Sequence, residues 1–213
     1  ASTPPSELAA VPSNGVRFLL YAWDAANDRP SSPLTRVGHA DIIENTSAQG
    51  RSYRLVVTAS NTVVLDYTTS FAFSQAQQRV VFSVNGFVTN GTKRANFTLD
   101  NTVSAANNGS VVLDYLVTVP SDNITLDYVV ALRNLNDPLG DEAVQIDLSL
   151  QGEGGRIDVN GTLNIAAGAA PDSDDSFAGF VGVLTVRVNN GTFATITLSA
   201  TSEPVIRNAA GQA

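Results

Sequence analysis

The clearest structural signal lies in residues 61–102, which have the sequence NTVVLDYTTSFAFSQAQQRVVFSVNGFVTNGTKRANFTLDNT. Three segments of this stretch alternate apolar and polar residues. Val80, Phe82 and Val84 occupy every second position, which places them on one face of an extended strand. Asn90-Gly91 follows, and this pair readily adopts the positive φ angles of a tight hairpin turn. The stretch therefore predicts an antiparallel β-protein.

The same alternation continues on both sides of this stretch. Residues 16–23 carry apolar side chains on both faces, which predicts a central strand. Asn160-Gly161 and Asn190-Gly191 predict two further hairpin turns. Further strands are expected at 36–44, 51–59, 110–119, 124–133, 143–150, 156–165, 178–188 and 192–200. The predicted fold class is all-β, an antiparallel meander or β-sandwich of about ten strands in two packed sheets, with little helix.

Short segments recur at intervals of about fifty residues. VVLDY occurs at 63–67 and again at 111–115, and ITLDY follows at 124–128. No helix or strict period accompanies them, so we interpret them as weak internal repeats within a meander rather than as a solenoid. The expected organisation is an extended N-terminal tail (1–15), a single β-sandwich-like domain (16–203) and a C-terminal tail (204–213).

Composition restricts the possible partners. Twenty acidic and twelve basic residues give a net charge of −8, which would repel nucleic acid. No apolar run approaches the roughly 20 residues of a membrane span. Cysteine is absent, so disulfides within the chain are excluded. Methionine is also absent, even at position 1, and the start at Ala1 is interpreted as that of a mature exported chain. We therefore expect a secreted or cell-surface protein.

No catalytic, metal-binding or cofactor-binding residue is predicted. His39 is the only histidine and would share a strand face with Asp41, but no nucleophile motif accompanies the pair. Two acidic segments that could attract calcium match no known loop spacing and are interpreted as turns. They contain Asn136, Asp137, Asp141 and Glu142 in the first and Asp172, Asp174 and Asp175 in the second. We expect no enzyme.

The repeated LDY segments place Asp66, Asp114 and Asp127 on the strand face opposite Leu and Tyr. Neighbouring strands in register would align these carboxylates in a row, which is unfavourable unless a cation or an arginine intervenes. Available partners are Arg54, Arg79 and Arg133. Solvated carboxylates on a polar face are the simpler interpretation.

The chain has more N-glycosylation patterns than the roughly three that random placement would give. They centre on Asn45, Asn90, Asn96, Asn108, Asn123, Asn160 and Asn190. Hairpin chemistry already accounts for the Asn-Gly-Thr/Ser members. If the source organism glycosylates asparagine, the excess indicates glycans at these residues. In an organism that does not, the excess indicates only turns.

Three functional hypotheses follow. The first is a non-catalytic structural or adhesive protein. Its more specific form is a pilus-like filament subunit that binds other copies of itself by strand addition, with Leu8 and Val11 as donor-strand anchors. The alternative is a carbohydrate- or lipid-binding β-domain, for which Trp23, Tyr21, Tyr53 and Tyr67 are the candidate aromatic residues. A glycosidase would need two carboxylates in a cleft, and nothing in the sequence selects two.

Overall fold

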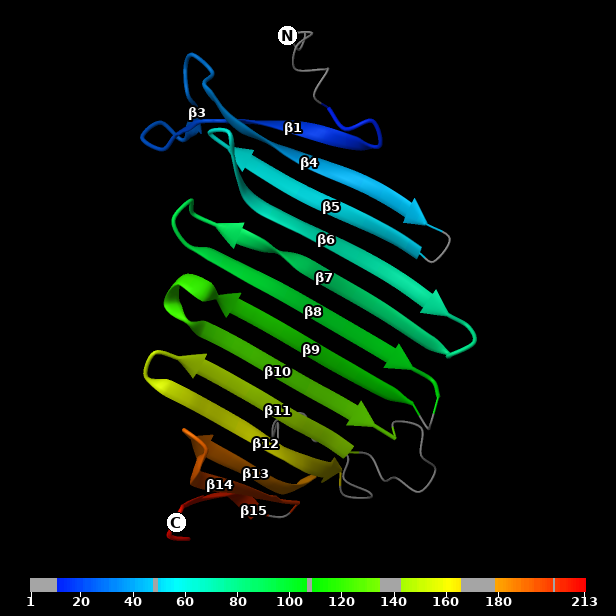
Figure 1. Cartoon of the computed structure of the whole chain (residues 1–213), viewed down its shortest axis with the longest axis vertical. Coiled ribbons are helices and arrows are strands. Elements are labelled where there is room, and N and C mark those ends of the chain that lie inside the picture. Colours follow the sequence, from blue (N-terminus) through cyan, green and yellow to red (C-terminus); the bar gives the residue numbers. More distant parts are fainter. Residues whose placement is uncertain (1–10, 48–49, 107–108, 135–142, 166–178, 201) are drawn as a thin grey trace.

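The computed structural model describes residues 11–47, 50–106, 109–134, 143–165, 179–200 and 202–213. Within these ranges the chain is almost entirely β-structure, with a single 3-10 turn at Pro120–Asp122. None of the described segments forms an apolar helix of membrane-spanning length. Thirteen strands form one large sheet, and Figure 1 shows it extending from the N-terminal end to the C-terminal end of the molecule.

The strands of the large sheet, in chain order, are β1 (Gly15–Tyr21), β4 (Arg36–Ser47), β5 (Gly50–Ala59), β6 (Thr62–Ser74), β7 (Arg79–Thr89), β8 (Arg94–Ser104), β9 (Ser110–Val119), β10 (Ile124–Arg133), β11 (Ala143–Gly152), β12 (Gly155–Ile165), β13 (Phe180–Val188), β14 (Gly191–Ser199) and β15 (Ser202–Asn208). Two short strands, β2 (Trp23–Asp24) and β3 (Arg29–Pro30), pair with each other between β1 and β4. Every strand of the large sheet pairs antiparallel with the strand next to it in this order.

The all-β class and the antiparallel meander predicted from the sequence are confirmed, with more strands than the expected ten. The described residues form no second packed layer of the kind a β-sandwich has. Each strand packs closely only against its neighbours in the sheet. The connectivity accounts for the strand order, because each hairpin returns the chain to the adjacent position in the sheet.

Two hairpins have turns whose central residues both have positive φ, as a type I′ turn requires. Ser60 and Asn61 connect β5 to β6 with φ of 48° and 65°, and Asn189 and Asn190 connect β13 to β14 with φ of 48° and 68°. The sequence predicted a turn at Asn190-Gly191, so it placed the second turn one residue too late.

The other Asn-Gly pairs have different outcomes. Asn90 and Gly91 lie in the β7–β8 connection, where the Asn90 Oδ1 accepts hydrogen bonds from the backbone N–H groups of Thr92 and Lys93 at 3.0 and 2.8 Å. The predicted turn at Asn160-Gly161 is wrong. Both residues lie inside β12, where Gly161 pairs with Ile146 on one side and Leu184 on the other.

Both edges of the sheet also differ from the sequence prediction. The first strand was expected to be central, yet among the described residues β1 pairs only with β4 and forms one edge, with Val16 and Phe18 more than half exposed. At the other edge, residues 204–208 belong to β15, so the C-terminal tail begins later than predicted. This strand is short and contains Pro204, which edge strands tolerate because one side of their backbone has no ladder partner.

Candidate functional site: an uncovered apolar sheet face

The most distinctive feature of the molecule is an apolar surface that runs across the large sheet. Directly paired residues on neighbouring strands point to the same face, so the pairing register assigns every side chain to one of two faces. We call the face that carries Leu99 the apolar face and the opposite face, which carries Asp100, the polar face. One row of the apolar face passes through Thr69, Val84, Leu99, Tyr115, Tyr128, Leu148, Val159 and Val186.

A second row lies beside the first on the same face. It passes through Tyr67, Gly86, Phe97, Val117, Leu126, Leu150, Ile157 and Val188. Neither row contains a charged residue, and the same holds for the other apolar-face positions of β6 to β14, where Asn101 and Thr69 are the polar exceptions. The alternation that the sequence showed in 61–102 therefore continues over nine strands in register.

Aromatic rings fill the gap left by a glycine in the second row. Gly86 lies between Tyr67 on β6 and Phe97 on β8, and the centroids of these two rings are 6.4 Å apart across it. A Cβ atom at Gly86 would lie 2.5 Å from the Cβ of Tyr67, so the close approach requires glycine. The two rings are inclined to each other by 53° and form part of the apolar face.

A second aromatic contact lies one strand pair further on. Tyr115 on β9 and Tyr128 on β10 face each other directly, with ring centroids 6.1 Å apart. The hydroxyl of Tyr115 donates a hydrogen bond of 2.9 Å to the side-chain oxygen of Asn101. The Tyr115 hydroxyl and the Asn101 side-chain oxygen are therefore paired with each other.

The apolar face is only partly covered by its own neighbours. Few of the described side chains are buried, and those on this face include Val130, Leu163 and Leu198. Phe71 is 52% exposed and Ile157 is 43% exposed, although both lie within strands. Isolated exposed apolar residues are ordinary, but a contiguous apolar surface larger than a few hundred Å² marks an interaction site.

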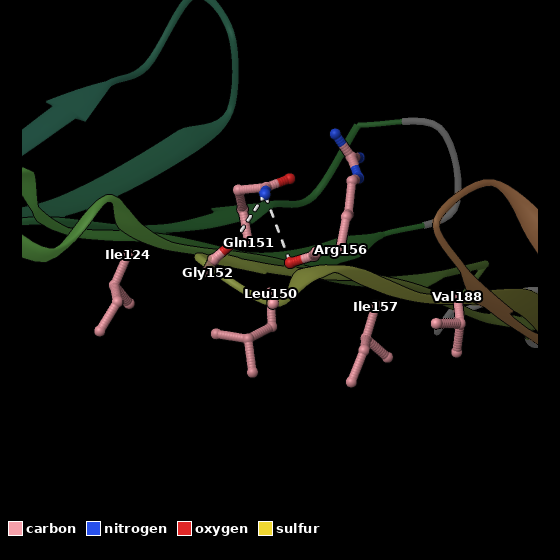
Figure 2. A pocket seen from close by; sticks show the side chains of 9 residues that line it. Ile124, Leu150, Gln151, Gly152, Arg156, Ile157 and Val188 are labelled. Atoms are coloured by element: carbon pink, nitrogen blue, oxygen red, sulfur yellow. Dashed lines mark hydrogen bonds between the residues drawn. The ribbon is translucent and has the colours of Figure 1, made fainter.

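Two shallow hollows lie on this face. The larger, of about 410 Å³, is lined by Ile124, Leu150, Ile157 and Val188 near the β11–β12 hairpin. Figure 2 shows these four side chains projecting from one side of the sheet, while Gln151 and Arg156 project from the other. The smaller hollow, of about 330 Å³, has Phe71 and Phe82 in its lining. Both hollows are shallow depressions in the surface rather than enclosed cavities.

The polar face is stabilised by cross-strand ion pairs. Arg54 on β5 donates two hydrogen bonds to Asp66 on β6, from Nε to Oδ1 at 2.8 Å and from Nη2 to Oδ2 at 2.6 Å. The hydrogen bonds from Arg54 hold the pKa of the Asp66 carboxyl below its usual value, against a smaller opposing effect of burial. Arg54 was one of the partners expected for the LDY aspartates.

The LDY aspartates do not form a row of their own. Asp66, Asp114 and Asp127 all lie on the polar face, as their alternation predicts. Asp114 instead pairs directly with Asp100 of β8, and Asp127 pairs with Ser149 of β11. In the described part of the chain no group of three or more His, Cys, Asp or Glu residues is arranged to hold a metal ion.

The pair of His39 and Asp41 lies on the polar face of β4. The Asp41 carboxylate accepts two hydrogen bonds of 2.6 Å from Arg17 on β1, and these lower the pKa of Asp41 although burial opposes the effect. The Nε2 of His39 is 3.8 Å from Oδ2 of Asp41. Because Arg17 already occupies the carboxylate, Asp41 is poorly placed to orient His39 as a general base.

The candidate glycosylation sites fall into two groups. Asn45, Asn90, Asn123 and Asn190 are exposed, whereas Asn96 and Asn160 are half-buried within β8 and β12. The side-chain oxygen of Asn96 accepts a hydrogen bond from Arg94 at 2.7 Å, and that of Asn160 accepts one from Arg187 at 2.6 Å. The exposed group is the better substrate for a transferase, because its amides face solvent. Asn108 lies outside the described residues.

The remaining candidates fall partly outside the described residues. Leu8 and both acidic segments, 136–142 and 172–175, lie outside them, whereas the proposed anchor Val11 is described and half-buried.

The aromatic candidates for a sugar platform are divided between surfaces. Tyr53 and Tyr67 lie on the apolar face, Tyr21 ends β1 and the 59% exposed Trp23 belongs to the small sheet.

Sequence reasoning missed the apolar face as a site, although its signal was present. The period of two in 61–102 placed Val80, Phe82 and Val84 on one face, and that face was assumed to be covered by a second sheet of the same chain. Comparisons with protein-family models, with curated proteins and with solved structures found no match for this chain.

Proposed function

We propose that this protein is a non-catalytic structural protein of the cell exterior that functions by associating with further copies of itself. The observation that carries the proposal is the amphipathic single-layer sheet, whose apolar face has no cover within the described chain. A sheet that is apolar on one face becomes stable by burying that face against another element. The chain supplies one layer and leaves the other to a partner.

The total accessible surface supports the same conclusion. The chain exposes 13719 Å², whereas a compact monomer of 22.3 kDa exposes about 9,400 Å². The difference of about 4,300 Å² is the excess expected of a single-layer sheet, because both of its faces are open to solvent.

A structural role also fits the arrangement of the charged groups. The ion pairs of Arg17 with Asp41 and of Arg54 with Asp66 connect neighbouring strands on a flat surface, where they serve the sheet itself. Catalysis needs groups that converge on a substrate in a water-excluding cleft. The net charge of −8 opposes nucleic acid as a partner. Export and exposed glycans remain part of this proposal.

The two open edges provide a route to longer assemblies. β1 carries no charged side chain except Arg17, which is engaged by Asp41, and its outer edge has no strand partner in the described chain. β15 is better protected, because Pro204 and the charged Glu203 and Arg207 discourage pairing with another strand. Strand addition is expected at β1 rather than at β15.

A lipid-binding role is the second candidate, and the hollow near the β11–β12 hairpin favours it. The lining of this hollow is mostly apolar, and its volume of about 410 Å³ would accommodate part of an acyl chain. The hollow is open along the sheet, so a lipid in it would remain half exposed unless something else covered it. This openness makes an isolated lipid a weaker occupant than a protein surface.

Light scattering after size exclusion, together with thermal unfolding at two concentrations, tests the proposal. We expect a mass above 22.3 kDa and an unfolding midpoint that rises with protein concentration. A hundredfold increase in concentration should add about 2.7 kcal/mol to the stability of a dimer, because association is linked to folding. A stable 22.3 kDa monomer whose midpoint does not depend on concentration would contradict self-association.

A further inference from the structure

We propose that two copies of this chain pair face to face, each apolar face covering the other, so that the dimer forms the two-layer β-sandwich that one chain does not complete. The inference rests on the proposed self-association and specifies its surface. It replaces edge-to-edge strand addition as the primary contact. The occupant of the apolar face is thus a second copy of the same face.

The size of the apolar face matches what a stable dimer needs. Thirteen strands at about 4.8 Å spacing span about 58 Å, and strands of about ten residues are about 33 Å long. The whole face therefore covers about 1,900 Å², and its uncharged part over the nine strands β6 to β14 covers about 1,300 Å². If twist allows only half of the uncharged part to make contact, the two copies together still bury about 1,300 Å², which lies within the range of specific, stable interfaces.

The chemistry of the face suits a copy of itself. From β6 to β14 the face carries no charge, and the Tyr115 hydroxyl is already bonded to Asn101. The carboxylates that give the chain its net charge lie mainly on the polar face and in connections. In a face-to-face pair the two polar faces are separated by two sheets packed about 10 Å apart, beyond the Debye length at physiological salt. Repulsion between copies is therefore weak where they meet.

The shape of the sheet also supports this pairing. Two sheets of the same right-handed twist pack with their strands aligned to within about 30°, and their inner side chains interdigitate. The hollow beside Leu150 and Ile157, of about 410 Å³, and the hollow beside Phe71 and Phe82, of about 330 Å³, are each large enough to receive several side chains of a partner. A partner with the same bulky Val, Ile, Leu and Phe side chains can fill them.

Matched lysine substitutions test the surface directly. Phe82 on β7 and Ile157 on β12 are 41% and 43% exposed in one chain, so a lysine there is compatible with folding of that chain. Asn85 and Thr162 lie on the same two strands but are exposed on the polar face. We expect Phe82→Lys and Ile157→Lys each to weaken dimerisation at least about 100-fold, because an unpaired charge would be buried.

In the same assay, Asn85→Lys and Thr162→Lys should retain a mass of twice 22.3 kDa. Far-ultraviolet circular dichroism on every variant separates lost association from lost folding. A second variant, directed at the β1 edge, distinguishes face-to-face pairing from strand addition. The Asn14 carbonyl accepts from the Glu44 N–H, so the alternation of the ladder directs the N–H of Leu19 to the open edge, and Leu19→Pro blocks strand addition there.

Each outcome has a separate meaning. Loss of the dimer in the apolar-face variants, with the dimer kept in Leu19→Pro and in the polar-face controls, supports face pairing. Loss only in Leu19→Pro overturns face pairing and leaves self-association through the edge. A wild-type monomer overturns both. A monomer that floats with uncharged phosphatidylcholine vesicles, and whose Phe82→Lys variant does not float, would assign the face to lipid and also overturn the inference.

Discussion

The two faces of the sheet differ in how completely one chain satisfies them. On the polar face, Arg17 with Asp41 and Arg54 with Asp66 form two-bond ion pairs between adjacent strands, and no buried side-chain polar atom of the described residues lacks a partner. On the apolar face, adjacent strands cover each side chain only from the side, and Phe71 and Phe82 remain 52% and 41% exposed.

The difference follows from the range of the two interactions. A hydrogen bond or ion pair is complete when two neighbouring strands are in register, so a single layer can satisfy polar groups. Hydrophobic stabilisation is proportional to the area removed from water, and a single layer leaves the outer part of each apolar side chain exposed to solvent. A one-layer amphipathic sheet is therefore locally complete on one face and incomplete on the other.

The largest stability effect is expected where the apolar face is most tightly packed. In Gly86→Ala the new methyl group would meet the Asp66 carbonyl oxygen and the Cβ of Tyr67, so the strands would have to separate. We expect a loss of about 2 kcal/mol, within the usual range for overpacking, as measured by urea unfolding.

The matched control for this change is Gly154→Ala in the β11–β12 hairpin, where the new methyl group would have no atom within 4 Å. This variant should change the stability by less than about 0.5 kcal/mol. Equal effects of the two variants would show that the Tyr67–Phe97 packing across Gly86 does not stabilise the apolar face.

A smaller effect is expected from removing charges on the polar face. Asp41→Asn breaks the pair with Arg17, in which both side chains are 10% exposed, and should cost about 1–2 kcal/mol. Asp66→Asn breaks the pair with Arg54, which is 47% exposed, and should cost no more than about 1 kcal/mol. Urea unfolding of the two variants measures the difference. A reversed order would mean that coverage by neighbouring strands does not set the strength of these pairs.

The smallest effect is a pH dependence of the polar face. The pKa values of Asp41 and Asp66 are lowered in the folded chain by their arginine partners. Their contribution is therefore complete above the unfolded-state pKa of about 4 and is lost as the pH falls through the lower folded-state pKa. We expect stability to decline below about pH 4, with a shallower decline in Asp41→Asn. Identical profiles would contradict a role for this ion pair.

Local pattern predicted much of the fold. The alternation at Val80, Phe82 and Val84 and at the LDY segments gave the correct strands and the correct face for each aspartate, because the period of two is a property of a single strand. β9 and β10 begin and end at the predicted residues. Both depend on interactions between residues close in the sequence.

What failed depended on longer-range structure. An Asn-Gly pair is compatible with both a turn and a strand, and at Asn160-Gly161 the close approach of Val183 and Leu184 selects the strand. The apolar residues on both faces of β1 predicted a central strand. The position of β1 at the edge depends instead on the order in which all strands of the meander pair, which its own residues do not encode. Whether the apolar face is covered by the same chain or by another depends on contacts between strands that are distant in the sequence, and no local pattern encodes those contacts.

Small-angle X-ray scattering of the wild-type protein tests face pairing most directly, since it reports mass and shape together. Face pairing predicts a particle of twice 22.3 kDa with nearly the same longest dimension as one sheet, because the second copy adds thickness. Edge pairing would instead lengthen the particle by about 58 Å for each added copy. A 22.3 kDa particle, or one that doubles in length, would contradict the account.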